Sequence, residues 1–326
     1  MPKNYKLLVV LVGPTAIGKT KVAIELATLF NTEIISADSR QFFRELNIGT
    51  AKPSDVELKQ VNHHFINSLS VSEAYDAGKY EQEANALILH LFKKYDILIM
   101  AGGSGMYIDA VCNGFDELPT IDPEIRKQLT KKYQDEGILS LQNQLKELDP
   151  DHSKKVDMQN PQRVIRALEI CLGTGKPYSS FLKNKNQVKS YRILKIGLNI
   201  AREKLYHQIN ERVDRMIMEG LADEVKTLIP YKKFNALQTV GYKELIDFFG
   251  DKADLSGKEA EINGDKTEMN DSVEWERTIE LIKKNTRNYA KRQLTWFKKD
   301  TDTTWFEPNQ TKAIIDYLSN HQIIFQ

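Results

Sequence analysis

Residues 13–20, GPTAIGKT, have the types and spacing of a loop that binds phosphate groups. Glycine lets successive backbone N–H groups turn toward one anion, and the N-terminus of a following helix adds positive potential. The Lys19 ammonium would neutralise phosphate oxygens, and the Thr20 hydroxyl would bind Mg²⁺, the cofactor that this pattern implies. By itself the loop favours a nucleoside triphosphate. The expected phosphate-binding residues are Gly13, Pro14, Thr15, Ala16, Ile17, Gly18, Lys19 and Thr20.

Two further polar side chains follow apolar runs that are typical of buried strands. Asp38 comes after EIISA, residues 33–37, and Ser104 lies within AGGSGMY, residues 101–107. A carboxylate close to bound phosphates could remove a proton from an acceptor, or it could be an ordinary loop residue or helix cap. The Gly-Gly-Ser sequence is weak evidence by itself, because glycines commonly separate a strand from a helix.

A basic segment with aromatic side chains lies near the end of the sequence. From Leu281 to Lys299 the chain has five lysines, two arginines and no acidic residue, interleaved with Tyr289, Trp296 and Phe297. Phosphate backbones and unstacked bases bind surfaces of this kind. We therefore favour a nucleic-acid contact over a helix that only buries its aromatic residues in the core.

Two other pairs of residues have less specific patterns. Arg163 and Arg166 lie three residues apart, on one face of an expected helix, where they could close over phosphate as a lid, contact nucleic acid, or simply face solvent. His63 and His64 are adjacent, so their side chains point apart, and no cysteine or histidine follows at the spacing of a metal site. We expect a structural role for both histidines.

The elements that must hold these residues alternate between strands and helices. Residues 7–12 form a continuous apolar run, typical of a central parallel strand that is buried on both faces. Helical spacing follows over residues 19–30, further strands are expected at 33–37 and 96–101, and a helix at 105–112. This order predicts an α/β fold, a P-loop NTPase-like parallel sheet flanked by helices, with the site at the carboxyl ends of the strands.

The pattern becomes helical in the middle of the chain. We expect a catalytic core from residues 1–118 and 191–326, interrupted by an all-helical insertion domain at 119–190. Asp122-Pro123 and Asn160-Pro161 have the order of an N-cap followed by proline in the first helical position.

A strand is expected where the chain returns from the insertion, at residues 191–200, with helices after it. Residues 251–274 are polar, rich in Asp and Glu, and nearly free of large apolar groups. They predict a solvated, mobile insert before a last helix at about 275–299.

Composition and charge exclude several classes of protein. The 326 residues suit about two domains of roughly 100–200 residues each, and 41% hydrophobic with 28% charged residues is typical of a globular protein. A net charge of +1 means that polyanion binding must come from local clusters. Two cysteines without a CxxC pair exclude a disulfide framework and a zinc ribbon. The apolar run at 7–12 is too short for a signal sequence or a membrane span, so we expect a cytoplasmic protein without membrane contact.

Seven segments from about residue 6 to 299 together resemble the bacterial tRNA dimethylallyltransferases, the tRNA isopentenyl transferase family. In chain order they are GPTAIGKT, ISADSRQFFRELNIGTAKP, HHFINSLSVSEAYDAGKY, AGGSGMYIDAV, NPQRVIRALEI, QTVGYKE and TRNYAKRQLTWF. The resemblance implies that the first loop binds the diphosphate of dimethylallyl diphosphate, and that Mg²⁺ helps to neutralise the departing diphosphate. The implied acceptor is the exocyclic amine of the adenosine 3′ to the anticodon in tRNA, flipped out of its stack.

The resemblance also implies roles for single residues. Asp38 matches the family's general base, and Lys19 the loop cation. Ser104 stands where the family usually has threonine, so a hydroxyl for a substrate contact is kept. Arg212 matches, less closely, an arginine expected near the diphosphate. The implied tRNA-binding residues are Asp38, Ser39, Arg40, Gln41, Ser104, Arg126, Gln162, Arg163, Val164, Ile165, Arg166, Gln238, Thr239, Val240, Gly241, Tyr242, Lys243, Arg287, Lys291 and Arg292.

Two other functions remain open at this point. A P-loop small-molecule kinase, or a prenyltransferase acting on free adenine nucleotides, would use the same loop but would not need the basic segment at 281–299. A non-catalytic RNA-binding module would not need Gly18, Lys19, Thr20 and Asp38 intact. We expect a monomer whose partners are dimethylallyl diphosphate and the anticodon stem-loop of tRNA.

Overall fold

The structure is a computed structural model that describes residues 6–116, 118–182, 189–255 and 264–323. It divides into two compact units, one from Met1–Cys112 with Lys189–Gln326, the other Asn113–Val188. We call them the α/β unit and the helical unit and describe each by itself. The helical unit begins and ends a few residues earlier than the insertion at 119–190 that the sequence predicts.

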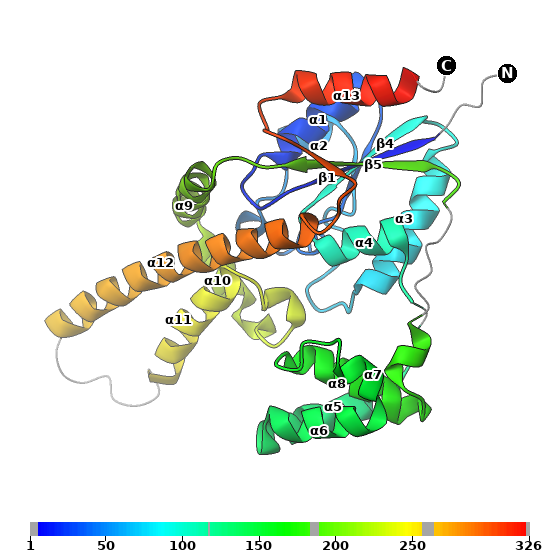
Figure 1. Cartoon of the computed structure of the whole chain (residues 1–326). Helices are drawn as coiled ribbons and strands as arrows, with labels where there is room; N and C mark the ends of the chain where they lie inside the picture. Colours follow the sequence, from blue (N-terminus) through cyan, green and yellow to red (C-terminus); the bar gives the residue numbers. More distant parts are fainter. Residues whose placement is uncertain (1–5, 117, 183–188, 256–263, 324–326) are drawn as a thin grey trace. The chain divides into compact units, whose positions relative to one another are not determined.

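A parallel sheet forms the centre of the α/β unit (Figure 1). Its strands lie in the order β3-β2-β4-β1-β5-β6, and each pairing among them is parallel. β1 is buried along its whole length. It lies between β4 and β5, and a hydrophobic core covers each face of the sheet. The strands are β1 (Leu7–Val12), β2 (Ile34–Ser36), β3 (His63–His64), β4 (Ile97–Gly102), β5 (Arg192–Leu198) and β6 (Thr303–Phe306).

Helices cover both faces of this sheet, so the predicted α/β fold is confirmed. The core on one face includes residues of α1, α9 and α13, and the core on the other face includes residues of α3 and α4. A third core joins α9, α10, α11 and α12. The helices of the unit are α1 (Lys19–Leu29), α2 (Asp55–Gln60), α3 (Ala77–Leu91), α4 (Gly105–Asn113), α9 (Arg202–Met218), α10 (Leu221–Leu228), α11 (Tyr242–Leu255), α12 (Gly264–Phe297) and α13 (Thr311–Ile323).

Helix α12 is longer than the sequence predicts. It begins at Gly264 rather than near residue 275, and α11, which lies beside it, continues to Leu255 (Figure 1). Much of the polar segment 251–274 is therefore helical, which corrects the predicted start of the last helix at about residue 275. Lysine, glutamate and methionine are good helix formers, so a polar stretch can extend a helix without an apolar face. Residues 256–263, and the predicted mobility there, lie outside the described residues.

The helical unit is built around its own small core. Leu129, Leu141, Leu145 and Leu168 are all buried within it, together with the apolar side of α8. Both predicted helix starts are confirmed, because the Asp122 and Asn160 side chains accept N–H groups of the turns that follow them. The helices of the unit are α5 (Pro123–Glu136), α6 (Ile138–Leu148), α7 (Pro150–Ser153) and α8 (Pro161–Thr174).

Candidate functional site

The loop of residues 13–20 connects the carboxyl end of β1 to the N-terminus of α1. Gly13, Ala16 and Gly18 have φ angles of 152°, 64° and 90°, so the backbone turns in a way that favours glycine. A Cβ on Gly13 would lie 2.8 Å from the Leu198 carbonyl oxygen, and therefore only glycine fits. No side chain caps the start of α1, which leaves the first N–H groups of the helix available to an anion.

The Lys19 side chain reaches back across this loop. Its Nζ donates to the Gly13 carbonyl at 3.0 Å and to the Pro14 carbonyl at 2.8 Å. Burial lowers the pKa of the ammonium to about 8. The nearby Arg212 also lowers this pKa, whereas the Asp38 carboxylate raises it. The ammonium lies among carbonyl groups and a second cation, so a bound diphosphate would supply the negative charge that favours its protonated form.

Asp38 follows β2 and faces the same pocket as the loop. Its Oδ1 accepts the Arg40 N–H at 3.0 Å, and this turn orients the carboxylate. Arg212 of α9 lines the pocket too, and burial lowers its pKa while Asp38 counteracts that shift. The pocket, of about 110 Å³, is lined by Thr15, Ala16, Ile17, Gly18, Lys19, Thr20, Asp38, Gln41, Thr50, Ala51, Arg212, Tyr289 and Gln293.

A second pocket adjoins the first and has apolar side chains on part of its wall, beside polar and charged ones. Both include Asp38, Arg212 and Tyr289 in their walls, so the carboxylate lies at their boundary. We call them the phosphate pocket and the apolar pocket. The apolar walls consist of Ile209, Val213, Met216, Leu221, Val240 and Ile282, from α9, α10, α12 and the segment before α11.

Ser104 holds the turn that contains Asp38. The Ser39 N–H donates to Ser104 Oγ at 2.9 Å, and Ser104 Oγ donates to Ser39 Oγ at 3.1 Å. The Ser104 side chain is buried, and Gly102 is required nearby because a Cβ there would lie 2.1 Å from the Ala37 carbonyl oxygen. Ser104 therefore positions the general-base candidate, and contact of its hydroxyl with substrate stays a prediction.

Two residues of α12, Tyr289 and Gln293, line the phosphate pocket. Neither of them was assigned to this pocket from the sequence. Tyr289 lines both pockets, and burial and the Asp38 carboxylate raise the pKa of its phenol. Gln293 is 6% exposed and contacts the phosphate loop. The four-residue spacing places both on one face of a helix, but the sequence does not show which loops that face meets.

Besides Ser104, three of the implied tRNA-binding side chains are buried, which corrects their assignment. Val164 and Ile165 lie in the core of the helical unit, since the apolar side of α8 packs against α5 and α6. Tyr242 is fully buried, its ring lies against Gly49, and its hydroxyl donates to Glu224 Oε1 at 2.6 Å. These three side chains stabilise their units and do not face solvent.

Other implied tRNA contacts are exposed to solvent. Those with exposed side chains are Arg126, Gln162, Arg163, Gln238, Lys243, Lys291 and Arg292. In the helical unit, Arg126 and Arg166 each lie 3.1 Å from the buried Glu169 carboxylate, which offsets part of their charge. Arg163 has no carboxylate partner within the described part of the chain.

The remaining assigned residues are half-buried or buried, and several of them hold other segments of the α/β unit by hydrogen bonds. Arg40 donates to the Asn235 carbonyl at 3.1 Å, Gln41 to the carbonyls of Thr50 and Ala51, and Arg287 to Asn210 Oδ1 at 2.6 Å. Ser39, Thr239, Val240 and Gly241 complete this group.

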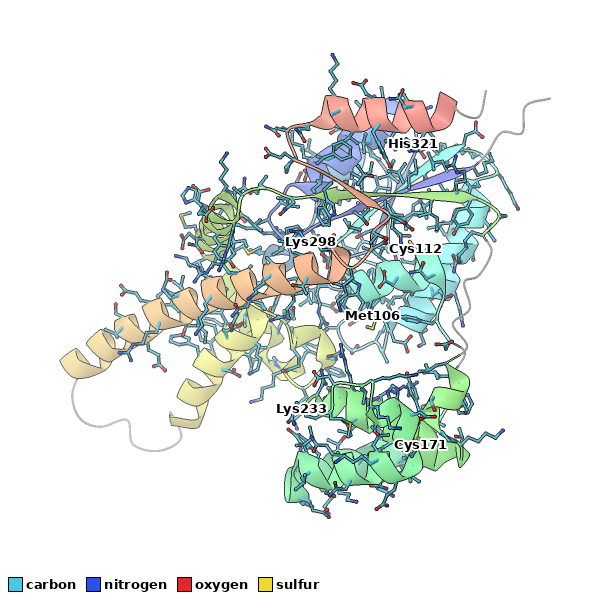
Figure 2. The ribbon with its side chains drawn as sticks, viewed as in Figure 1. Met106, Cys112, Cys171, Lys233, Lys298 and His321 are labelled. Atoms are coloured by element: carbon cyan, nitrogen blue, oxygen red, sulfur yellow. The ribbon has the colours of Figure 1, made fainter. Side chains whose placement is uncertain are left out.

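The outer face of α12 is basic. Among the described residues, no carboxylate pairs with the exposed Lys291, Arg292 and Lys298, the last of which Figure 2 labels near the end of the helix. The aromatic residues of this segment are divided. Phe297 is buried, which corrects its assignment to a nucleic-acid surface, whereas Trp296 stays partly exposed and donates to Asp109 Oδ2 at 2.8 Å.

The two adjacent histidines have the structural role that the sequence predicts. His64 Nε2 lies 2.6 Å from Glu33 Oε2, and His63 Nδ1 lies 2.8 Å from the Val61 carbonyl oxygen. Across the described residues, His, Cys, Asp and Glu side chains form no group of three or more that could hold a metal ion. Thr20 remains the candidate ligand for Mg²⁺, which typically takes its other ligands from phosphate and water.

Comparison with known proteins identifies the family. Residues 41–300 match the family model described as IPP transferase. The chain belongs to this family. It is 48% identical over 318 residues to the tRNA dimethylallyltransferase of Christiangramia forsetii, covering 97% of this chain and 98% of that one. It is 45% identical to tRNA dimethylallyltransferase 1 of Bacteroides thetaiotaomicron over 313 residues, 95% of this chain and 94% of the relative.

Solved structures of IPP transferases have the same P-loop NTPase-like fold. The tRNA isopentenylpyrophosphate transferase of Bacillus halodurans superposes with a TM-score of 0.66 at 33% identity, over 97% of this chain and 96% of that one. A eukaryotic dimethylallyltransferase acting on tRNA gives a TM-score of 0.72 at 26% identity, over 97% of this chain and 80% of that one. No helix in the described ranges has the length and apolar character needed to cross a membrane.

Proposed function

We propose that this protein transfers the dimethylallyl group of dimethylallyl diphosphate to the exocyclic amine of the adenosine 3′ to the anticodon in tRNA, and releases diphosphate. One observation supports this most directly: the Asp38 carboxylate lies where the phosphate pocket meets the apolar pocket. A prenyl donor needs both pockets, one for its diphosphate and one for its hydrocarbon. The names of the relatives support the same reaction.

The phosphate pocket would hold the leaving group. Backbone N–H groups at the start of α1 and the Lys19 ammonium favour negative charge there, and Arg212 adds a second cation. The Thr20 hydroxyl would help to hold Mg²⁺, which when bound neutralises charge on the departing diphosphate. These groups stabilise the charge that develops on the bridging oxygen as the carbon–oxygen bond breaks.

Asp38 would serve the acceptor side of the reaction. An adenine exocyclic amine is a poor nucleophile because its lone pair is delocalised into the ring. As its nitrogen forms a bond to the donor's first carbon, the carbon–oxygen bond breaks and its electron pair leaves with the diphosphate. The amine proton passes to the Asp38 carboxylate, which keeps the product neutral. The apolar walls would exclude water, which competes as an acceptor.

The basic face of α12 supports an RNA acceptor over a free nucleotide. Lys291, Arg292 and Lys298 are exposed, and the Tyr231–Asn235 segment after α10 adds exposed Lys232 and Lys233, the second labelled in Figure 2. Phosphate groups spaced along a strand would bind such separated cations. A single small acceptor would reach few of them.

The test uses purified protein, dimethylallyl diphosphate, Mg²⁺ and an anticodon stem-loop with the target adenosine. Mass spectrometry of digested RNA should show adenosine in which one amine hydrogen is replaced by a dimethylallyl group. Free AMP in place of the RNA, and ATP in place of the donor, test the alternative enzymes. The proposal fails if the RNA stays unmodified, or if AMP is prenylated at least as fast as the stem-loop.

A further inference from the structure

The Gln293 side chain connects helix α12 to two loops that are far away in the sequence. Its Oε1 accepts the Thr15 N–H at 2.8 Å, and its Nε2 donates to the Gly103 carbonyl at 2.8 Å. The carboxamide is almost completely buried, and a Cβ on Gly103 would lie 2.4 Å from Nε2. The site is therefore shaped closely around this one side chain.

A carboxamide can make both hydrogen bonds from this position, which none of the permanently charged side chains can. It accepts through its oxygen and donates through its nitrogen, whereas a carboxylate cannot donate and an ammonium or guanidinium cannot accept. The two partners are a backbone N–H at the pocket wall and a buried backbone carbonyl, and both would lose this hydrogen bond if Gln293 were apolar. The glutamine at position 293 thus matches the hydrogen-bonding groups of both loops.

Each of these loops holds part of the proposed reaction centre. Thr15 belongs to the loop that would bind the diphosphate, and Gly103 precedes Ser104, whose hydroxyl contacts Ser39 beside Asp38. Gln293 consequently fixes the distance between the leaving-group loop and the loop that supports the general base. Reactions of this kind depend on such positioning to within a fraction of an ångström.

Lys291 lies on the opposite side of the same helical turn, whereas Arg292 lies beside Tyr289, with its guanidinium 5.8 Å from the centroid of that ring. Lys291 and Arg292 immediately precede Gln293 and are exposed, and Tyr289, one turn earlier, lines the pocket next to Asp38. RNA bound to the outer face of α12 would restrain the turn from which Gln293 projects inward. A restraint on one side of a helix acts on the other side because the backbone between them is rigid.

We propose that Gln293 is a positioning residue that couples RNA binding on α12 to the geometry of the diphosphate loop. The inference rests on the proposed function and names a route by which its acceptor prepares the donor site. Diphosphate should therefore bind more weakly to the free protein than to the protein with RNA bound. By thermodynamic reciprocity, diphosphate should tighten RNA binding by the same factor.

The test measures binding and turnover separately. Inorganic diphosphate with Mg²⁺ is titrated into the full chain, alone and with saturating stem-loop, by calorimetry. We expect the unsubstituted protein to bind diphosphate at least about fivefold more tightly with RNA present. In Gln293→Met, which fills a similar volume without either hydrogen bond, this ratio should fall to near one and kcat should fall at least tenfold. The Kd for RNA alone should stay within threefold.

Gly103→Ala disturbs the same contact from the opposite side and serves as a second variant. Thr295→Met, an exposed change on the same helix, is the matched control and should keep the coupling ratio. The proposal is overturned if Gln293→Met and Gly103→Ala keep that ratio, or if they lose RNA binding and thermal stability together. Failure of the proposed function would be visible separately, as unsubstituted protein that binds diphosphate and RNA but does not prenylate the RNA.

Discussion

At the scale of single residues, the phosphate pocket places one carboxylate beside two cations. Asp38 offsets the mutual repulsion of Lys19 and Arg212, because its negative charge attracts both of them. An ionised carboxylate can accept a proton. A bound diphosphate would add further negative charge beside the two cations. The same three side chains can thus serve the leaving group and the acceptor at once.

Replacing Asp38 with asparagine should separate catalysis from binding. Asparagine keeps an oxygen to accept the Arg40 N–H, so the turn is preserved, but it cannot take up the amine proton. We expect the single-turnover rate to fall by about 10²- to 10⁴-fold, while the Kd for the stem-loop changes little. Asp302→Asn, an exposed change, is the control. Undiminished turnover in Asp38→Asn would contradict the assignment of the general base.

Lys19 predicts how donor affinity depends on pH. Its pKa in the free protein is about 8, so the ammonium loses its proton as the pH rises through this value. A bound diphosphate favours the protonated form, and affinity for dimethylallyl diphosphate should therefore decline above pH 8, by at most about tenfold per pH unit. Calorimetric titrations on both sides of pH 8 measure the decline. In Lys19→Arg, which stays charged, this decline should disappear, and an equal decline there would assign it to another group.

A substitution at Tyr242 should distinguish a structural role from a role in RNA binding. Its hydroxyl donates to Glu224 Oε1 in a buried site, so Tyr242→Phe should lower the free energy of unfolding by about 1–3 kcal/mol. RNA affinity should not change. Chemical denaturation and RNA titration measure the two quantities, with the exposed Tyr231→Phe as control. A loss of RNA affinity without a loss of stability would restore Tyr242 to the tRNA-binding residues.

The parts of the site that are local in the chain could be predicted from the sequence. The phosphate loop is a continuous strand–loop–helix segment, and Asp38 directly follows a recognisable strand. The contact between Gln293 and Thr15 could not be predicted, because it joins residues 278 positions apart. Val164 and Ile165 show a different reason: a continuous motif includes both faces of a helix, and only three-dimensional packing separates its core residues from its surface.

At the scale of elements, α12 combines two tasks on its two sides. The inner side contributes Tyr289 and Gln293 to the phosphate pocket, and the outer side exposes Lys291. The α11–α12 pair has its own apolar core with α9 and α10, and Ala290 and Phe297 of α12 also pack into the two cores of the sheet. An element with this construction can bind a large polyanion and shape a small pocket together.

The outer cations of α12 should contribute to RNA affinity and not to the chemical step. In a Lys291→Ala, Lys298→Ala double variant we expect weaker stem-loop binding, with an unchanged single-turnover rate when both RNA and donor are saturating. The slope of log K against log salt should become shallower by about 0.7 to 0.9 for each phosphate group that the variant no longer binds. Fluorescence anisotropy over a series of salt concentrations measures the slope. Lys312→Ala on α13 is the control, and an unchanged slope in the double variant would place the RNA elsewhere.

At the scale of the whole molecule, the chain contains two units with separate cores. The helical unit buries its leucines among α5, α6 and α8, while the α/β unit has its own layers on both faces of the sheet. The phosphate pocket and the apolar pocket are lined entirely by residues of the α/β unit. Donor binding should therefore need only the α/β unit to be folded.

Leu145→Ala tests this independence, because Leu145 is fully buried in the helical unit. The cavity should destabilise that unit by about 2–5 kcal/mol, and hydrogen exchange should quicken in α5, α6 and α8 but not in β1 or β4. Dimethylallyl diphosphate should bind the variant with unchanged affinity. Leu148→Ala, at a partly exposed position of the same helix, should change exchange far less. If β1 and β4 lose protection together with the helices, the two units unfold as one, and donor binding depends on both.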